Sequence, residues 1–177
     1  ILRIFHTELE AVYEEKNRSL DSDPNKVNEA LMAALFPTHN YGQQTTIGTV
    51  EHLKNPSLVE IRKYFNQYYV PNNMAIIMAG DLNPDEVVQL IDQKFSYWKP
   101  KEVTLYNPPA EAPLAKIQTV EVFGPTPDNV RLGYRLPGAL DVKATILATI
   151  CDEVMSNSAA GLIDLNLNKQ QKILGGG

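Results

Sequence analysis

Two glutamates near the start of the chain, Glu8 and Glu15, have a spacing at which their carboxylates could act together. Seven residues make almost two helical turns, so a helix here places both carboxylates on one face, with Ala11 and Val12 between them. A helix face on which acidic and small apolar residues alternate is typical neither of a solvent-exposed surface nor of a buried core. We therefore expect at least one carboxylate to face inward and meet a cation or a hydrogen-bond donor, because an unpaired buried charge is very costly. Whether that partner is a metal decides the function.

Complete zinc motifs are absent from the sequence. His6 and Glu8 form a His-x-Glu pair of the kind found in zinc deaminases, but those enzymes also need a Pro-Cys-x-x-Cys segment, and Cys151 is the only cysteine. The helical zinc-peptidase motifs need two histidines within five residues. The three histidines of this chain lie far apart in the sequence: His6, His39 and His52.

Composition excludes several classes of protein. The 177 residues are 44% hydrophobic, which suits one globular domain. A net charge of -5 argues against a nucleic-acid partner, which normally requires a basic patch. The longest apolar run, Met74 to Ala79, is far shorter than the roughly 20 residues of a membrane-spanning helix. Since the chain begins at Ile1 and ends in three glycines, we expect it to be part of a longer polypeptide.

Apolar periodicity and capping residues predict most of the chain to be helical. Ser57 with Glu60, Asn83 before Pro84, and Asp141 mark three helix starts. Thr7 with Glu10 fits a capping box, although the pair could also lie inside a helix that begins earlier. The predicted helices cover about residues 4–20, 25–35, 57–69, 84–97, 142–155 and 160–174.

Three segments have the composition of β-strands. Residues 74–79 form a continuous apolar run, and residues 117–123 and 130–136 are further strand candidates, the last with alternating apolar residues. The order of elements predicts an α+β fold with helices packed on a mixed or antiparallel sheet. We expect one partial domain over residues 1–177, made of a helical part (1–98), a proline-rich connector (99–116) and a strand–strand–helix–helix part (117–177).

In combination, these features resemble the pitrilysin/insulinase family of zinc metallopeptidases, whose relatives include the mitochondrial processing peptidases. The resemblance covers essentially the whole chain, and the order and spacing of the motifs are more specific than any one of them. The segments that carry it are Glu8–Glu15, Asp21–Pro24, His39–Gly42 with Ile47–Gly48, Lys63–Asn73, Ala79–Asp81 and Asp128–Tyr134.

The resemblance implies a zinc site to which this chain contributes one ligand. In the family, two histidines of a His-x-x-Glu-His helix and one downstream glutamate hold the metal, and that glutamate corresponds to Glu15. Glu8 corresponds to the second glutamate of the downstream helix, which supports the site without binding zinc. Two imidazoles and a carboxylate would leave the fourth position of Zn²⁺ for water.

No His-x-x-Glu-His occurs in this sequence. The resemblance places that motif upstream, so we expect the chain to be an inactive fragment of a metalloendopeptidase that cleaves oligopeptides or unfolded proteins. The alternative is a catalytically silent domain that binds peptides or a sister subunit, and a third interpretation is an α+β domain whose acidic helix is only structural. The resemblance further implies a peptide substrate, a second peptidase-like domain or subunit closing a chamber, and a bacterial cell-envelope location.

Overall fold

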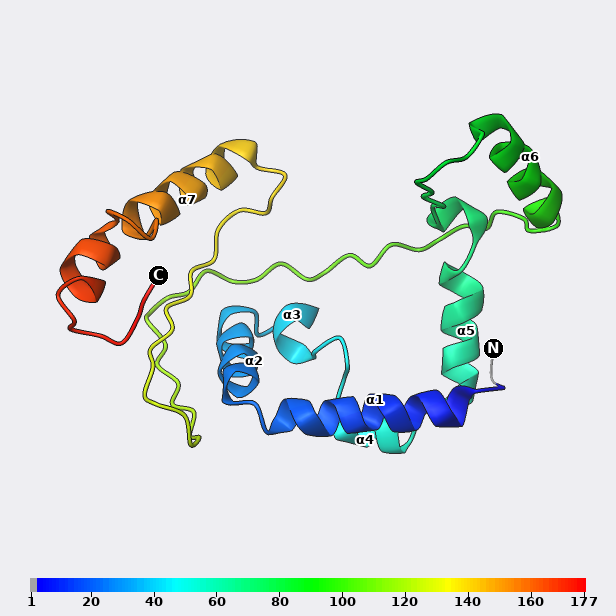
Figure 1. Ribbon diagram of the computed structural model, residues 1–177. Coiled ribbons are helices and arrows are strands. Elements are labelled where there is room, and N and C mark those ends of the chain that lie inside the picture. Colours follow the sequence, from blue (N-terminus) through cyan, green and yellow to red (C-terminus); the bar gives the residue numbers. More distant parts are fainter. Residues whose placement is uncertain (1–2) are drawn as a thin grey trace. The chain divides into compact units, whose positions relative to one another are not determined.

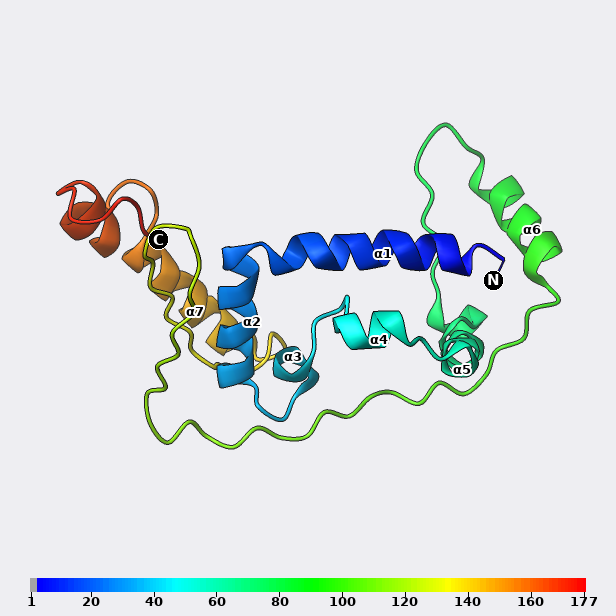
Figure 2. The same ribbon diagram turned by 90° about the horizontal axis from the view of Figure 1, so that it is seen from below.

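The computed structural model describes residues 3–177 and divides into two compact units, Ile1–Asn129 and Val130–Gly177. Figures 1 and 2 show that the described elements are helices joined by extended segments. The first unit contains α1 (Phe5–Leu20), α2 (Asp23–Leu35), α3 (Asn40–Gln43), α4 (Val50–Lys54), α5 (Leu58–Tyr68), the short 3₁₀ turn η1 (Pro71–Asn73) and α6 (Pro84–Phe95). The second unit contains α7 (Val142–Met155) and the π-helical turn η2 (Asp164–Asn168).

The helix starts predicted from capping residues are confirmed. The Ser57 hydroxyl accepts a hydrogen bond from the Glu60 backbone N–H at 3.3 Å. Asn83 Oδ1 accepts from the Asp85 N–H at 3.1 Å, and Asp141 Oδ1 accepts from the Ala144 N–H at 3.0 Å. Each bond satisfies a backbone donor that the first turn of a helix leaves without an intrahelical partner.

Two other predictions about helices are not met: the cap at the start of the first helix and the extent of the last helix. The first helix begins at Phe5 with no side-chain cap, so Thr7 lies inside the helix and the capping box is wrong. The helix expected over residues 160–174 is reduced to a few residues around η2. There the buried Asp164 carboxylate accepts hydrogen bonds from the backbone N–H groups of Asn157 and Gly161, at 2.9 and 3.2 Å. These bonds fold the segment after α7 back on itself instead of extending a new helix.

In the first unit, α1 contacts both α2 and α4, and α2 contacts α3. The two views agree that α4 runs beside α1 and that α3 lies next to α2 (Figures 1 and 2). None of the described helices is long and apolar enough to cross a membrane.

The proline-rich connector predicted from the sequence is an extended segment held near its two ends. At one end, the Asn72 side chain donates to the Lys101 carbonyl at 2.8 Å and accepts from the Lys101 N–H at 3.1 Å. At the other, Glu111 Oε1 accepts from the backbone N–H groups of Thr38 and His39, at 2.8 and 2.7 Å. Hydrogen bonds between side chains and backbone groups therefore fasten the connector to other segments of the first unit.

The predicted α+β fold is wrong, because residues 3–177 contain no β-strand. The three predicted strands lie in non-helical segments that join no ladder, and Ile77, Ile117 and Leu132 are 91%, 93% and 77% exposed. Alternating or continuous apolar residues favour an extended backbone, but a strand also needs a partner in register to accept and donate its hydrogen bonds. The sequence pattern supplied the first condition, and the structure does not meet the second.

Little apolar surface is buried within either unit. The solvent-accessible area is 14839 Å². Two separate compact domains with the lengths of these units would expose about 10,000 Å² in total. Among the described residues, Val70 is the buried apolar side chain, at 1% exposure. Contacts between neighbouring helices and polar ties, more than a common core, define the local structure.

Candidate functional site

The acidic helix predicted from the sequence is α1, and its two faces differ sharply in character. Five residues that recur at helical spacing form its inner stripe, all of them buried or half-buried: Phe5, Leu9, Val12, Tyr13 and Lys16. Glu8 and Glu15 lie off this stripe, and both are exposed. The expectation that at least one of these carboxylates faces inward is therefore not met. The inward-facing charge on α1 belongs to Lys16.

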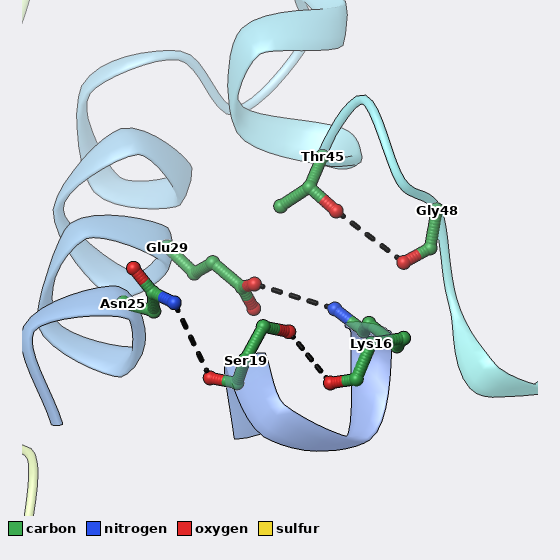
Figure 3. Close-up of polar contacts among 6 residues, drawn as sticks. All are labelled: Lys16, Ser19, Asn25, Glu29, Thr45 and Gly48. Carbon is green, nitrogen blue, oxygen red and sulfur yellow. Dashed lines mark hydrogen bonds and ion pairs between the residues drawn. The ribbon is translucent and has the colours of Figure 1, made fainter. Parts of the chain in front are cut away.

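Lys16 is 5% exposed, which is unusual for a lysine. Its ammonium group lies 3.4 Å from Glu29 Oε1, a carboxylate carried by α2. Figure 3 shows the Lys16 amine directed at the Glu29 carboxylate. This pair links α1 to α2 at the point where the two helices converge.

Further polar bonds hold the junction between α1 and α2. The Ser19 hydroxyl donates to the Lys16 carbonyl at 2.7 Å, and Asn25 Nδ2 approaches the Ser19 carbonyl at 3.4 Å (Figure 3). In a separate local turn, the Thr45 hydroxyl donates to the Gly48 carbonyl at 3.3 Å. Gly48 has φ of 77°, a left-handed conformation that glycine adopts without steric penalty.

Asp23 connects the start of α2 to a distant segment of the first unit. Its carboxylate accepts from the Lys26 ammonium and from the Thr126 backbone N–H, each at 3.0 Å. The hydrogen bond from Lys26, followed by that from Thr126, holds the pKa of the Asp23 carboxyl below its ordinary value. Asp23 therefore favours the charged state in the folded chain and fastens residues far apart in sequence.

The histidines have local structural roles or stand in solvent. His39 Nδ1 accepts from the Tyr41 backbone N–H at 3.0 Å and so caps α3, while its ring lies 4.3 Å from the Tyr41 ring. The exposed His6 ring contacts Phe5 edge-on, and His52 is exposed on α4. Over residues 3–177, no three His, Cys, Asp or Glu side chains come together as a metal site.

The predicted zinc ligand Glu15 lies on the solvent side of α1. Its carboxylate is exposed, and neither Glu8 nor Glu15 takes part in an ion pair within the described part of the chain. A glutamate carboxylate is one of the oxygen ligands that Zn²⁺ accepts. The described residues do not bring this carboxylate together with two further His, Cys, Asp or Glu side chains.

Reasoning from the sequence missed both the Lys16–Glu29 pair and the Asp23 tie. The signal for Lys16 was present, because it follows Phe5, Leu9 and Val12 at the spacing of an apolar stripe where an apolar residue is expected. No local signal identifies Thr126 as the partner of Asp23, since the two residues are 103 positions apart.

Comparison with known proteins finds relatives that are peptidases. The chain is 24% identical over 165 residues to the probable zinc protease PqqL of Haemophilus influenzae, covering 91% of this chain and 17% of the relative. It is 28% identical over 138 residues to the zinc protease PqqE of Helicobacter pylori, covering 75% of this chain and 31% of the relative. The mitochondrial-processing peptidase subunit beta of Dictyostelium discoideum is 25% identical over 101 residues, 57% of this chain and 21% of the relative.

The chain thus spans less than a third of the length of these relatives. No solved structure matches it. The model of the "Peptidase M16 inactive domain" family matches residues 57–174, so α1 with Glu8 and Glu15 precedes the matched region. This match, over more than half of the chain, shows that the protein belongs to the M16 peptidase family.

Proposed function

We propose that the chain is part of a zinc-dependent metalloendopeptidase in which Glu15 is one of the metal ligands. The observation that carries the proposal is the exposed pair of carboxylates on α1, free of ion pairs in the described residues, in a chain of the M16 family. The names of the two bacterial relatives, both zinc proteases, support the choice of metal. A bound zinc ion would lower the pKa of a coordinated water and so make it a nucleophile towards a peptide carbonyl.

In this proposal the two glutamates of α1 act differently. Glu15 contributes a carboxylate oxygen to the metal. Glu8, seven residues earlier and so almost two full turns away on the same face of the helix, supports the neighbouring ligands through hydrogen bonds. The remaining ligands come from the rest of the parent protein, since the described residues contain no group of three donors.

The test is the zinc content and peptidase activity of the complete parent protein carrying Glu15→Ala. We expect the variant to lose bound zinc and turnover together, because one of three protein ligands has been removed. Glu14→Ala is the matched control: Glu14 is adjacent to Glu15 and also exposed on α1, but it points in a different direction. Normal zinc content and turnover in Glu15→Ala would refute the assignment.

A second candidate function is a catalytically silent domain that binds peptides or a sister subunit. The description of the matched family model as an inactive domain favours it. In that case the complete protein would carry no stoichiometric zinc and would bind an unfolded peptide without cleaving it. Metal analysis of the purified protein, followed by mass spectrometry of a peptide incubated with it, separates the two functions.

We further propose that the parent protein lies in the bacterial cell envelope and has a second peptidase-like domain or subunit opposite this one. The organisms of the two zinc-protease relatives support a bacterial source, and the small share of each relative that this chain covers, 17% and 31%, leaves room for a second domain. Subcellular fractionation followed by size-exclusion chromatography would test both points.

A further inference from the structure

Lys16 lies on the inward-facing stripe of α1, where an apolar residue is expected. At about 100° per residue, it continues the inner stripe of Phe5, Leu9 and Val12. A lysine usually keeps its ammonium group in water by extending its side chain to the surface. Here the side chain is only 6% exposed. The ammonium group is therefore held in the interface between α1 and its neighbours.

The pairing with Glu29 makes this burial tolerable. An ionised group that leaves water needs an opposite charge or several hydrogen bonds. The Glu29 carboxylate, 3.4 Å away, is its ion-pair partner among the described residues, and the Glu29 side chain is 44% exposed. Since Glu29 belongs to α2, the pair keeps the Lys16 side of α1 turned towards α2 (Figure 3).

That direction determines where the two glutamates point. Glu15 lies one residue from Lys16, about 100° around the helix, and Glu8 lies within about 20° of Glu15. The apolar residues alone specify the rotation of α1 weakly, because an apolar stripe spans an arc of about 100° or more. The buried Lys16 side chain and its ion pair with Glu29 add a second constraint on this rotation, because the lysine must stay on the side of α1 that faces α2.

Small rotations matter at a metal ligand. With side chains at a radius of about 5–6 Å, turning the helix by about 20° moves a carboxylate by about 2 Å. Ligands must lie within about 0.5 Å of their productive positions.

We propose that the Lys16–Glu29 pair is a positioning device that sets the rotation of α1 and so presents Glu15 to the metal. This inference rests on the proposed function, in which Glu15 binds zinc. Lys16 and Glu29 are positioning residues: neither touches the metal or the substrate.

The experiment compares variants of the complete parent protein by zinc affinity, measured in competition with a chromophoric chelator. We expect Glu29→Gln and Lys16→Met each to weaken zinc binding about 10-fold or more, the loss typical of residues that orient metal ligands. Lys16→Arg keeps the charge and should retain most of the affinity. The double variant should lose no more than the stronger single variant, because the two residues act as one unit.

The control is the ion pair Lys63–Glu60 on α5, which joins the same residue types at 2.6 Å but is 66% exposed on both sides. Lys63→Met and Glu60→Gln should leave zinc affinity unchanged. A second readout separates positioning from general loss of stability. The absorption spectrum of the Co²⁺-loaded protein, recorded well below its unfolding temperature, should change shape in Glu29→Gln and not in Glu60→Gln, because it reports ligand geometry.

The results distinguish failure of the positioning role from failure of the proposed function. If Glu15→Ala abolishes zinc binding while Glu29→Gln and Lys16→Met behave like the α5 controls, the positioning role is refuted and the proposed function stands. If Glu15→Ala retains zinc, the proposed function fails and the positioning role with it. Should Lys16→Met fail to fold, Glu29→Gln carries the test alone, because Glu29 is half-exposed.

Discussion

Val70 offers the most direct test of where the first unit is stable. It lies between the end of α5 and η1, is 1% exposed, and its carbonyl accepts from the Asn73 N–H at 2.9 Å. Val70→Ala removes two buried carbon atoms, worth about 0.8 kcal/mol each, and leaves a small cavity, so the expected loss is about 2 kcal/mol. That loss corresponds to an increase of about 30-fold in the local opening equilibrium.

Hydrogen exchange of the complete protein, followed by mass spectrometry of peptides covering residues 64–73, measures this opening directly. The matched control is Val59→Ala on α5, where the valine is 64% exposed and the change should stay within about 0.5 kcal/mol. If the two variants speed exchange equally, or if Val70→Ala speeds it less than about threefold, burial at Val70 does not stabilise this region.

Two other perturbations test the polar and close-packed contacts. In Gly42→Ala the new Cβ would collide with the Phe36 carbonyl and lie 2.6 Å from the Met32 carbonyl, so we expect exchange over residues 28–44 to rise about 5- to 150-fold, the equivalent of about 1–3 kcal/mol. Gly138→Ala, with open space around its Cβ, should leave that exchange unchanged. Because the pKa of Asp23 is lowered by folding, its contribution to stability is complete above the unfolded value of roughly 3.9 and is lost as the pH falls through the lower folded value. The Thr126 amide resonance should therefore titrate below that value in the native protein and lose the titration in Asp23→Asn; a midpoint at or above the ordinary value would contradict the assignment.

The sequence predicted local features of the fold well. Ser57, Asn83 and Asp141 each cap the helix that follows them, because a cap depends on residues within three positions of one another. The bounds of α1, α2, α5, α6 and α7 differ from the prediction by about two residues at most. The short helix α3 lies between two of the predicted helices and was not predicted; it is capped by His39.

Non-local features could not be predicted in the same way. The apolar run at residues 74–79 has the composition of a buried strand, yet most of its side chains are exposed and it pairs with nothing in residues 3–177. The bond from Asp23 to Thr126 and the bonds from Glu111 to Thr38 and His39 also join segments more than 70 positions apart. No periodicity in a single sequence encodes such pairings.

In the candidate site, too, the local features could be predicted from the sequence and the contacts between helices could not. Glu8 and Glu15 share a face of α1 as their spacing predicts, and both face solvent instead of the interior. The inward charge is Lys16, whose place on the apolar stripe can be read from the sequence. Its partner Glu29 depends on how α1 meets α2, which the sequence does not specify.

The large accessible area of the chain also has a calorimetric consequence. The heat-capacity change of unfolding follows the apolar surface that becomes hydrated, and here much of that surface, such as Ile77 and Ile117, is already in water. Heating this chain on its own would therefore give a small heat-capacity step and a broad, gradual transition. In the complete protein, the same surface would add to the step only where another part covers it, so the size of the step measures how much of it is covered.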